Sequence, residues 1–204
     1  MQSSPTNPST QQPLIPAPTP RSRRDLLNRL GLPCSAEAPG VEETPHPAET
    51  PRAMVERLAR AKAAAVAARH PGAWVIGSDQ VAVLGDTVLG KPLTEARCRE
   101  QLQACSGHEV QFLTAVSLCC SERGIERLHV DETVVTFRVL EAAQIARYVA
   151  IERPLDCAGG FKCEGLGIRL FERIDSSDPT ALIGLPMIWL AGALADSAGL
   201  DPLA

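Results

Sequence analysis

The residue with the clearest chemical potential in this chain is Asp79, an acid set inside an apolar run. The segment from Trp74 to Leu84 reads Trp-Val-Ile-Gly-Ser-Asp-Gln-Val-Ala-Val-Leu and ends at a Gly-Asp turn. Such a run is typical of a β-strand that is covered on both faces. An ionised carboxylate is costly there unless a cation, a metal ion or hydrogen-bond donors meet it. Asp79 therefore needs a partner or has a chemical role, although an exposed acid at a strand end fits the same run.

Two further groups of charged residues lie before this strand. Arginines at positions 21, 23 and 24 begin a predicted helix, where cations oppose the helix dipole. An anion such as phosphate between these arginines and the free N–H groups would explain them. A solvated basic patch is the alternative, and the residues alone favour it somewhat. Glu42 and Glu43 occupy a loop, either as solvated acids or as metal ligands.

Lysines and glycines complete the set. Lys62 lies among alanines of a predicted helix, where a lysine more often snorkels than catalyses, and Lys91 follows a glycine in a turn. Residues 159–167 read Gly-Gly-Phe-Lys-Cys-Glu-Gly-Leu-Gly, and we expect Lys162 and Glu164 on one face of a glycine-punctuated strand. The spacing fits neither a P-loop nor the dinucleotide fingerprint. Together the groups offer cations for phosphates, carboxylates for a divalent metal and a water, and a wall for a base, as nucleotide hydrolysis requires.

The elements that must position these residues alternate between helices and strands. We expect helices over residues 22–30, 51–70, 94–105, 141–152 and 186–198. We expect strands over residues 74–84, 109–120, 125–139 and 161–174. The second and third strands are joined by Ser-Glu-Arg-Gly and predict an antiparallel hairpin. The order predicts a single α/β domain with a mixed sheet.

Composition sets broad limits on function and location. The 204 residues are 45% hydrophobic, enough for one globular domain with its own core. A net charge of −4 gives no general attraction for a nucleic-acid polymer or an anionic membrane, and no run approaches the ~20 apolar residues of a membrane span. Without a recognisable signal peptide, we expect a cytoplasmic protein.

Two other features follow from composition. The seven cysteines lack paired CxxC spacing, so we expect small buried hydrophobes in a reducing cytosol rather than zinc ligands or disulfides. Residues 1–13 are rich in Pro, Ser, Thr and Gln, and we expect them to form a disordered tail before a folded domain at 14–204.

The ordered motifs resemble the Maf family of nucleoside triphosphate pyrophosphatases, in particular its branch associated with 7-methyl-GTP. The matching blocks include Arg23-Arg24-x-Leu26-Leu27, Leu58-Ala59-x-x-Lys62-Ala63, Gly77-Ser78-Asp79-Gln80-Val81, Gly90-Lys91-Pro92-Leu93, Pro154-Leu155-Asp156-Cys157-Ala158-Gly159 and Phe161-Lys162-x-Glu164-Gly165-x-Gly167. The resemblance covers nearly the whole folded part. It implies an elongated mixed β-sheet flanked by helices, and attack of water on an α-phosphate to give a nucleoside monophosphate and diphosphate.

The resemblance also implies roles for individual residues. Asp79 matches the family's general base, and Glu43 matches an acid near the metal and the water, so both are expected at a site for Mg²⁺ or Mn²⁺. The positions that match phosphate-binding residues are Arg23, Arg24, Lys62 and Lys91. The expected partner is a nucleotide substrate, with no nucleic-acid polymer and no membrane, and the chain could form a homodimer.

Base preference is implied at three positions. Gln80 and Glu164 fit the pairing of the 7-methyl-GTP branch, where a carboxylate suits a cationic methylated guanine. Ser22 departs from that branch, which usually carries an aromatic residue there that could stack on the base. The third position therefore predicts a weaker preference for the methylated base.

Further departures lie at the beginning of the domain. Pro20 replaces the family's phosphate-binding serine, and Pro16 and Pro18 disfavour a central strand after Leu14. Two alternatives follow. The chain could be a non-catalytic or weakly active nucleotide-binding regulator of septum formation, or a pyrophosphatase with a different base preference.

Overall fold

The computed structural model describes residues 13–17, 21–32 and 34–203. The tail predicted over residues 1–13 lies outside the described residues, apart from Pro13. The Pro13 carbonyl oxygen accepts a hydrogen bond from the Trp74 N–H at 3.0 Å, so this residue already adjoins the sheet. Pro20 also lies outside the described residues.

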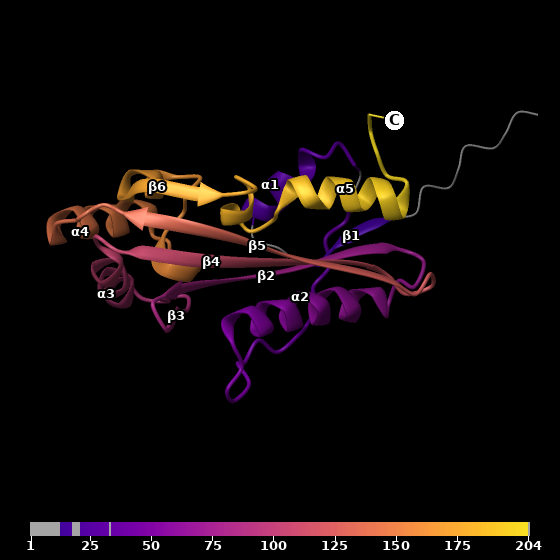
Figure 1. Cartoon of the computed structure of the whole chain (residues 1–204), viewed down its shortest axis with the longest axis horizontal. Coiled ribbons are helices and arrows are strands. Elements are labelled where there is room, and N and C mark those ends of the chain that lie inside the picture. The colour runs from indigo at the N-terminus through magenta and orange to yellow at the C-terminus, as the bar shows by residue number, and fades with distance from the viewer. Residues whose placement is uncertain (1–12, 18–20, 33, 204) are drawn as a thin grey trace, which may run out of the picture.

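One mixed β-sheet of six strands runs along the length of the molecule (Figure 1). Its strands are β1 (Leu14–Pro16), β2 (Trp74–Leu84), β3 (Thr87–Leu89), β4 (Glu109–Cys120), β5 (Ile125–Phe137) and β6 (Phe171–Ser176). The order is β1-β2-β4-β5-β6, with β3 paired to β2. The β1–β2 pairing is parallel and the others are antiparallel. The predicted α/β fold with an elongated mixed sheet and a β4–β5 hairpin is confirmed.

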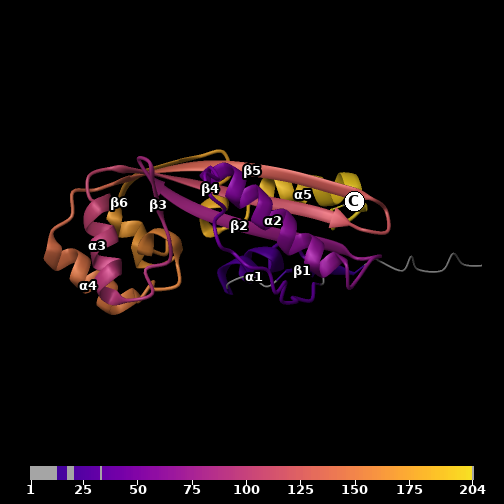
Figure 2. The same ribbon diagram turned by 90° about the horizontal axis from the view of Figure 1, so that it is seen from below.

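Helices cover both faces of this sheet and one of its ends. The α-helices are α1 (Arg21–Asn28), α2 (Pro51–Ala67), α3 (Glu95–Cys105), α4 (Ala142–Glu152) and α5 (Met187–Ala198). Helix α2 lies along one face, α1 and α5 lie along the other, and α3 and α4 gather at the end away from β1 (Figures 1 and 2). Thr50 and Thr94 are the N-caps of α2 and α3, because their side-chain oxygens accept hydrogen bonds from the N–H groups of Ala53 and Arg97 in the first turns.

Proline explains why β1 is short and peripheral. Pro16 lacks an N–H, and its carbonyl oxygen accepts from Glu37 N at 3.0 Å on the side away from β2. β1 is accordingly an edge strand that pairs with only three residues of β2. The position of β1 at the edge agrees with the expectation that Pro16 disfavours a central strand, whereas Pro18 lies outside the described residues.

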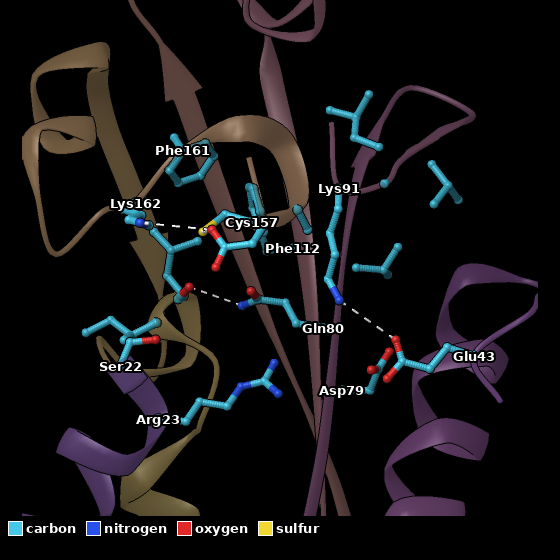
Figure 3. A pocket seen from close by; sticks show the side chains of 18 of the residues that line it. Ser22, Arg23, Glu43, Asp79, Gln80, Lys91, Phe112, Cys157, Phe161 and Lys162 are labelled. Carbon is cyan, nitrogen blue, oxygen red and sulfur yellow. Dashed lines mark hydrogen bonds and ion pairs between the residues drawn. The ribbon is translucent and has the colours of Figure 1, made fainter. Parts of the chain in front are cut away.

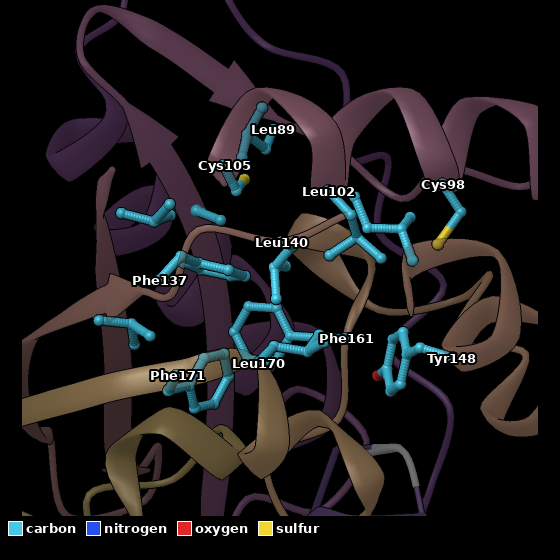
Figure 4. Close-up of a cluster of buried hydrophobic side chains, with 14 of the residues drawn as sticks. Leu89, Cys98, Leu102, Cys105, Phe137, Leu140, Tyr148, Phe161, Leu170 and Phe171 are labelled. Carbon is cyan, nitrogen blue, oxygen red and sulfur yellow. The ribbon is translucent and has the colours of Figure 1, made fainter. Parts of the chain in front are cut away.

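Aromatic packing fixes the end of the sheet beside α3 and α4 (Figure 4). The Phe161 ring lies edge-on to the rings of Phe112, Phe137 and Phe171, with centroids 4.8–5.6 Å apart. Each such pair contributes ~0.5–1.5 kcal/mol beyond the burial of apolar area. Phe161 thereby anchors the glycine-rich segment that lines the functional cavity described below.

The strand predicted over residues 161–174 is wrong for most of its length. β6 begins only at Phe171, and 3₁₀ turns occupy Ala158–Gly160 and Leu166–Leu170. Gly159 and Gly160 have φ of 74° and 73°, which is the left-handed region. The Lys162 carbonyl oxygen accepts from the N–H groups of both Gly165 and Gly167. The glycines therefore build turns, and Lys162 and Glu164 do not share a strand face.

Other expectations concern the cysteines and the membrane. All seven cysteines are free, but only four of them are buried. The expectation of buried cysteines is therefore wrong for Cys34, Cys157 and Cys163, which are partly exposed. Within the described ranges, no helix combines the length and apolar character that a membrane crossing needs.

Candidate nucleotide-binding site

A cavity of about 550 Å³ opens between α1, α2, the middle of β2 and the turns after residue 155 (Figure 3). Its walls carry most of the residues singled out in the sequence. One part is charged, with Arg23, Glu43, Lys62, Asp79 and Lys91. The other part combines aromatic and polar side chains, namely Gln80, Phe112, Asp156, Phe161, Lys162 and Glu164. The cavity is large enough for a nucleotide-sized ligand.

Lys62 joins the two acids of the charged part. Its Nζ lies 2.6 Å from Asp79 Oδ1 and 2.6 Å from Glu43 Oε1. Lys62 and Asp79 are only 8% and 9% exposed, whereas Glu43 is exposed at the mouth of the cavity. The partner that the buried acid required is therefore a lysine from the facing helix, and the snorkelling alternative for Lys62 is not what the structure shows.

Burial and charge push the pKa values of the two acids apart. Burial raises the pKa of Asp79 above its ordinary value, although Lys62 and Arg23 oppose this shift. Partial burial would also raise the pKa of Glu43, but hydrogen bonding to Lys62 and its charge lower that pKa overall. Two carboxylates separated in this way suit different tasks, because the one with the higher pKa is the better proton acceptor.

Gly77 explains how α2 comes close enough to β2 to bring Lys62 to Asp79. A Cβ atom at Gly77 would lie 2.2 Å from the Ala59 carbonyl oxygen and 2.6 Å from the Ala63 N. These atoms belong to the helix backbone, which cannot move aside as a flexible side chain could. Helix and strand therefore meet where Gly77 faces Ala59 and Ala63, the second of which adjoins Lys62.

We expect Gly77→Ala to lower the free energy of unfolding by about 3 kcal/mol, because overpacking forces α2 away from the sheet. Urea unfolding would measure this change. Gly192→Ala is the matched control, since nothing lies within 4 Å of a Cβ at this glycine of α5. In a helix, that change should be neutral or stabilising by up to ~1 kcal/mol. Equal unfolding midpoints for Gly77→Ala and the wild type would contradict the close approach.

Arg23 enters the cavity from α1. Its Nη1 donates to the Ser78 carbonyl oxygen at 3.3 Å, whereas its buried Nε has no hydrogen-bond partner among the described residues. Gly184 makes room for it, because a Cβ there would lie 2.4 Å from Nε. A buried guanidinium donor without a partner beside two acids is suited to binding an anion.

The neighbouring residues of α1 lie differently. Ser22 lines the cavity, but Arg24 is exposed and is not among the lining residues. The helical repeat explains why Arg23 faces the cavity and Arg24 faces solvent. Arg23 precedes the buried Leu26 and Leu27 by three and four residues and so lies on the same face of α1. Periodicity could thus have separated the two arginines.

Lys91 reaches the cavity from the segment after β3. Its Nζ lies 3.9 Å from Glu43 Oε2, and its side chain is 58% exposed. Figure 3 shows Lys91 and Glu43 pointing toward one another across the opening. Lys91 is therefore a cation at the mouth, where a charged substrate tail would enter.

Gln80 has a fixed amide in the other part of the cavity. Its Nε2 donates to the carbonyl oxygens of Ala181 and Leu182 at 3.0 and 3.1 Å, and to Thr114 Oγ1 at 2.9 Å. These acceptors occupy the amide nitrogen and leave the carbonyl oxygen to accept from a ligand. Glu164 also lines the cavity and is exposed.

Two lining residues of the cavity, Asp156 and Phe112, were not predicted as site residues from the sequence. Asp156 Oδ1 lies 4.0 Å from Lys162 Nζ, and the Tyr148 hydroxyl oxygen accepts from the Lys162 N–H. Phe112 contributes an aromatic surface. Asp156 belongs to the block at residues 154–159 that matches the family, so it could have been predicted as a site residue. A buried phenylalanine in a strand has no comparable sequence signal.

The donor set fits a divalent metal ion. Mg²⁺ in phosphate chemistry is usually held by one or two carboxylates together with substrate phosphates and waters. Glu43 and Asp79 each keep one carboxylate oxygen outside the Lys62 bridge. The part of the chain that the structure describes contains no group of three His, Cys, Asp or Glu residues able to form a metal cage. These residues therefore suit a metal that the substrate's phosphates help to bind.

Comparison with known proteins places this chain in a family. Residues 13–197 match the family described as Maf-like protein. A 7-methyl-GTP pyrophosphatase of Xanthomonas oryzae pv. oryzae (strain MAFF 311018) is 55% identical over 184 residues, 90% of this chain and 96% of that protein. A protein of the same name from Alkalilimnicola ehrlichii is 55% identical over 178 residues, 87% of this chain and 89% of its own. With a match over nearly the whole domain, the chain belongs to the Maf-like protein family.

Proposed function

We propose that the protein hydrolyses 7-methyl-GTP to 7-methyl-GMP and diphosphate with the help of a divalent metal ion. The observation that carries this proposal is the placement of a buried Asp79 in a nucleotide-sized cavity that also holds Arg23, Lys62 and Lys91. The names of the relatives supply the substrate, and the residues that match their branch, Gln80 and Glu164, lie in the same cavity.

The reaction uses each charged residue in turn. Arg23, Lys62 and Lys91 bind the phosphate oxygens and offset their charge. Asp79 takes a proton from a water molecule as the water oxygen forms a bond to the α-phosphorus. The bond between the α-phosphorus and the bridging oxygen breaks, and diphosphate leaves with the electron pair. Asp79 and Glu43 would hold Mg²⁺ or Mn²⁺, which supplies further positive charge for the phosphates.

Base recognition follows from the other part of the cavity. The 7-methylguanine ring carries a positive charge, which the carboxylate of Glu164 attracts, and its N–H groups are donors for the fixed carbonyl oxygen of Gln80. Ser22 offers no aromatic face to the ring. A cation–π contact is worth ~0.5–2 kcal/mol, or about one decade of affinity. We therefore expect 7-methyl-GTP to be preferred over GTP, by a smaller margin than an aromatic residue at position 22 would give.

Two substitutions test this base preference through the specificity constants for 7-methyl-GTP, GTP and UTP. Glu164→Gln should lower the ratio of the specificity constant for 7-methyl-GTP to that for GTP, because it removes the negative charge that attracts the methylated ring. Ser22→Trp should widen the ratio by up to about tenfold through stacking on that ring. A wild-type preference for UTP over 7-methyl-GTP would contradict the assignment of the base and leave a pyrophosphatase of different specificity.

The non-catalytic alternative has less support. A regulator that only binds nucleotides needs no buried acid with a raised pKa, yet Asp79 is such an acid and lies 2.6 Å from Lys62, one of the cations proposed to bind phosphate. The homodimer and the cytoplasmic location stay predictions from the sequence.

A further inference from the structure

We propose that Arg57 and Glu49 form a clamp that positions Glu43 for metal binding. This inference rests on the proposed function only in the use it gives to Glu43. Arg57 touches neither the cavity nor Asp79, so it would act as a positioning residue through the loop that carries Glu43.

The need for such a device arises from the loop itself. Glu43 lies in a stretch without helix or strand that ends at Thr50, the N-cap of α2. Its carboxylate must nevertheless stay within 2.6 Å of Lys62 Nζ. Ordering each backbone residue of a free loop costs ~1–2 kcal/mol, so a loop that presents a ligand needs contacts elsewhere.

The clamp supplies these contacts immediately after Glu43. Arg57 Nε and Nη2 donate to Glu49 Oε1 and Oε2 at 2.6 and 2.7 Å, which is a two-pronged bond. Nη2 also donates to the Thr44 carbonyl oxygen at 3.3 Å, and Glu49 Oε2 accepts from the His46 N–H at 3.0 Å. Arg57 thus binds both ends of the turn from Thr44 to Glu49.

Both attachment points of the loop lie on one helix. Arg57 and Lys62 are separated by five residues of α2, or about 7.5 Å along its axis. Arg57 fixes the peptide next to Glu43, and Lys62 receives the Glu43 carboxylate. Because the helix is rigid between these residues, the clamp sets where the carboxylate lies relative to Asp79. An ion pair that served only stability would not need to bind the residue adjoining a metal ligand.

Helix α2 also offers a matched control. Arg60 Nη1 lies 2.6 Å from Glu126 Oε1, so Arg60 makes a comparably short ion pair one turn away. That pair fastens α2 to β5 and leaves the loop untouched. Arg60→Ala therefore removes an arginine and an ion pair from the same helix without altering the support of Glu43.

The first test measures Mn²⁺ binding to the free protein by calorimetry. Arg57→Ala should raise the dissociation constant of Mn²⁺ by about tenfold, as is typical for residues that orient a metal ligand. The dissociation constant of Arg57→Lys should lie between those of Arg57→Ala and the wild type, because a lysine keeps the charge but cannot donate two parallel hydrogen bonds to Glu49. Arg60→Ala should leave Mn²⁺ binding unchanged.

A double-mutant cycle then asks whether Arg57 acts through Glu43. In a Glu43→Gln background, Arg57→Ala should change the Mn²⁺ dissociation constant by less than about twofold, since the ligand it positions has been removed. The same tenfold change in both backgrounds, or no change in the wild-type background, would overturn the proposal.

A second measurement needs neither metal nor nucleotide. Hydrogen exchange at the amides of His46 and Glu49, which donate hydrogen bonds within the turn, should become at least about tenfold faster in Arg57→Ala than in Arg60→Ala, because local opening of the loop costs less without the clamp. Unchanged exchange would overturn the clamp even if the enzyme proved to use another substrate. Conversely, if the wild type hydrolysed no nucleotide but Arg57→Ala still showed faster exchange, the proposed function would be rejected and the clamp would stand.

Discussion

Asp79→Asn is expected to lower the turnover number by roughly 10²–10⁴, the usual effect of losing a general base. The substitution keeps the shape of the side chain and removes its capacity to accept a proton. Arg23, Lys62 and Lys91 remain, so the dissociation constant for the nucleotide should change little. Single-turnover measurements of diphosphate release, with binding measured separately, would resolve the two effects. Full activity of Asp79→Asn would reject Asp79 as the base.

The same substitution has an expected effect on stability. Burial raises the folded-state pKa of Asp79 above its unfolded value, so its contribution to stability is present at low pH and is lost as the pH rises through the folded-state pKa. At neutral pH the ionised carboxylate therefore opposes folding, whereas asparagine carries no charge. Lys62 keeps its ion pair with Glu43 in this variant, so the substitution leaves no buried charge without a partner. We therefore expect Asp79→Asn to melt at a temperature at least as high as the wild type at pH 7, and a clear drop would indicate a structural role.

Lys62→Met should have the second large effect, on binding, pH dependence and stability together. It removes the cation that lies 2.6 Å from both acids, so a triphosphate should lose more affinity than a monophosphate. Removing one partner of a buried ion pair typically costs ~3–5 kcal/mol, and Asp79 then remains buried beside Glu43. The pKa of Asp79 should rise further, which moves the acid limb of the pH profile of turnover to higher pH.

The sign of this stability loss can be checked with pH. A carboxyl whose folded-state pKa is raised is tolerated when protonated, so the deficit of Lys62→Met should be largest near pH 8 and shrink toward pH 5. Urea unfolding at both pH values would measure it. Arg60→Met serves as the control, since an exposed ion pair contributes only ~0–1 kcal/mol. A deficit that does not change with pH would mean that Lys62 stabilises the protein by packing alone.

The sequence predicts the part of this site that depends on regular elements. The apolar run around Asp79 predicts a covered strand, and the Thr50-Pro51 start predicts the helix that carries Lys62. Their contact could not be predicted from periodicity, because it depends on how closely α2 approaches Gly77 in three dimensions. The strand predicted over the glycine-rich segment was wrong for a related reason. Glycine permits both extended and turn conformations, and the hydrogen bonds from the Gly165 and Gly167 N–H groups to the Lys162 carbonyl oxygen hold this segment in turns.

The loop residues likewise could not be predicted from the pattern of regular elements. Glu43 could be recognised only through its family motif, since an acid in a loop has no local signal for function. The clamp from Arg57 joins residues eight and thirteen positions apart across an irregular turn. No pattern of hydrophobicity records such a bond, because it depends on the path of the loop.

The most direct test of the central claim is hydrolysis of 7-methyl-GTP in ¹⁸O-labelled water with Mg²⁺ present. Attack of water on the α-phosphorus predicts one ¹⁸O atom in 7-methyl-GMP, unlabelled diphosphate in equal amount, and neither product from Asp79→Asn on the same timescale. Label in diphosphate or orthophosphate would place the attack at another phosphorus atom, and the absence of any hydrolysis would reject the assignment of this cavity as a pyrophosphatase site.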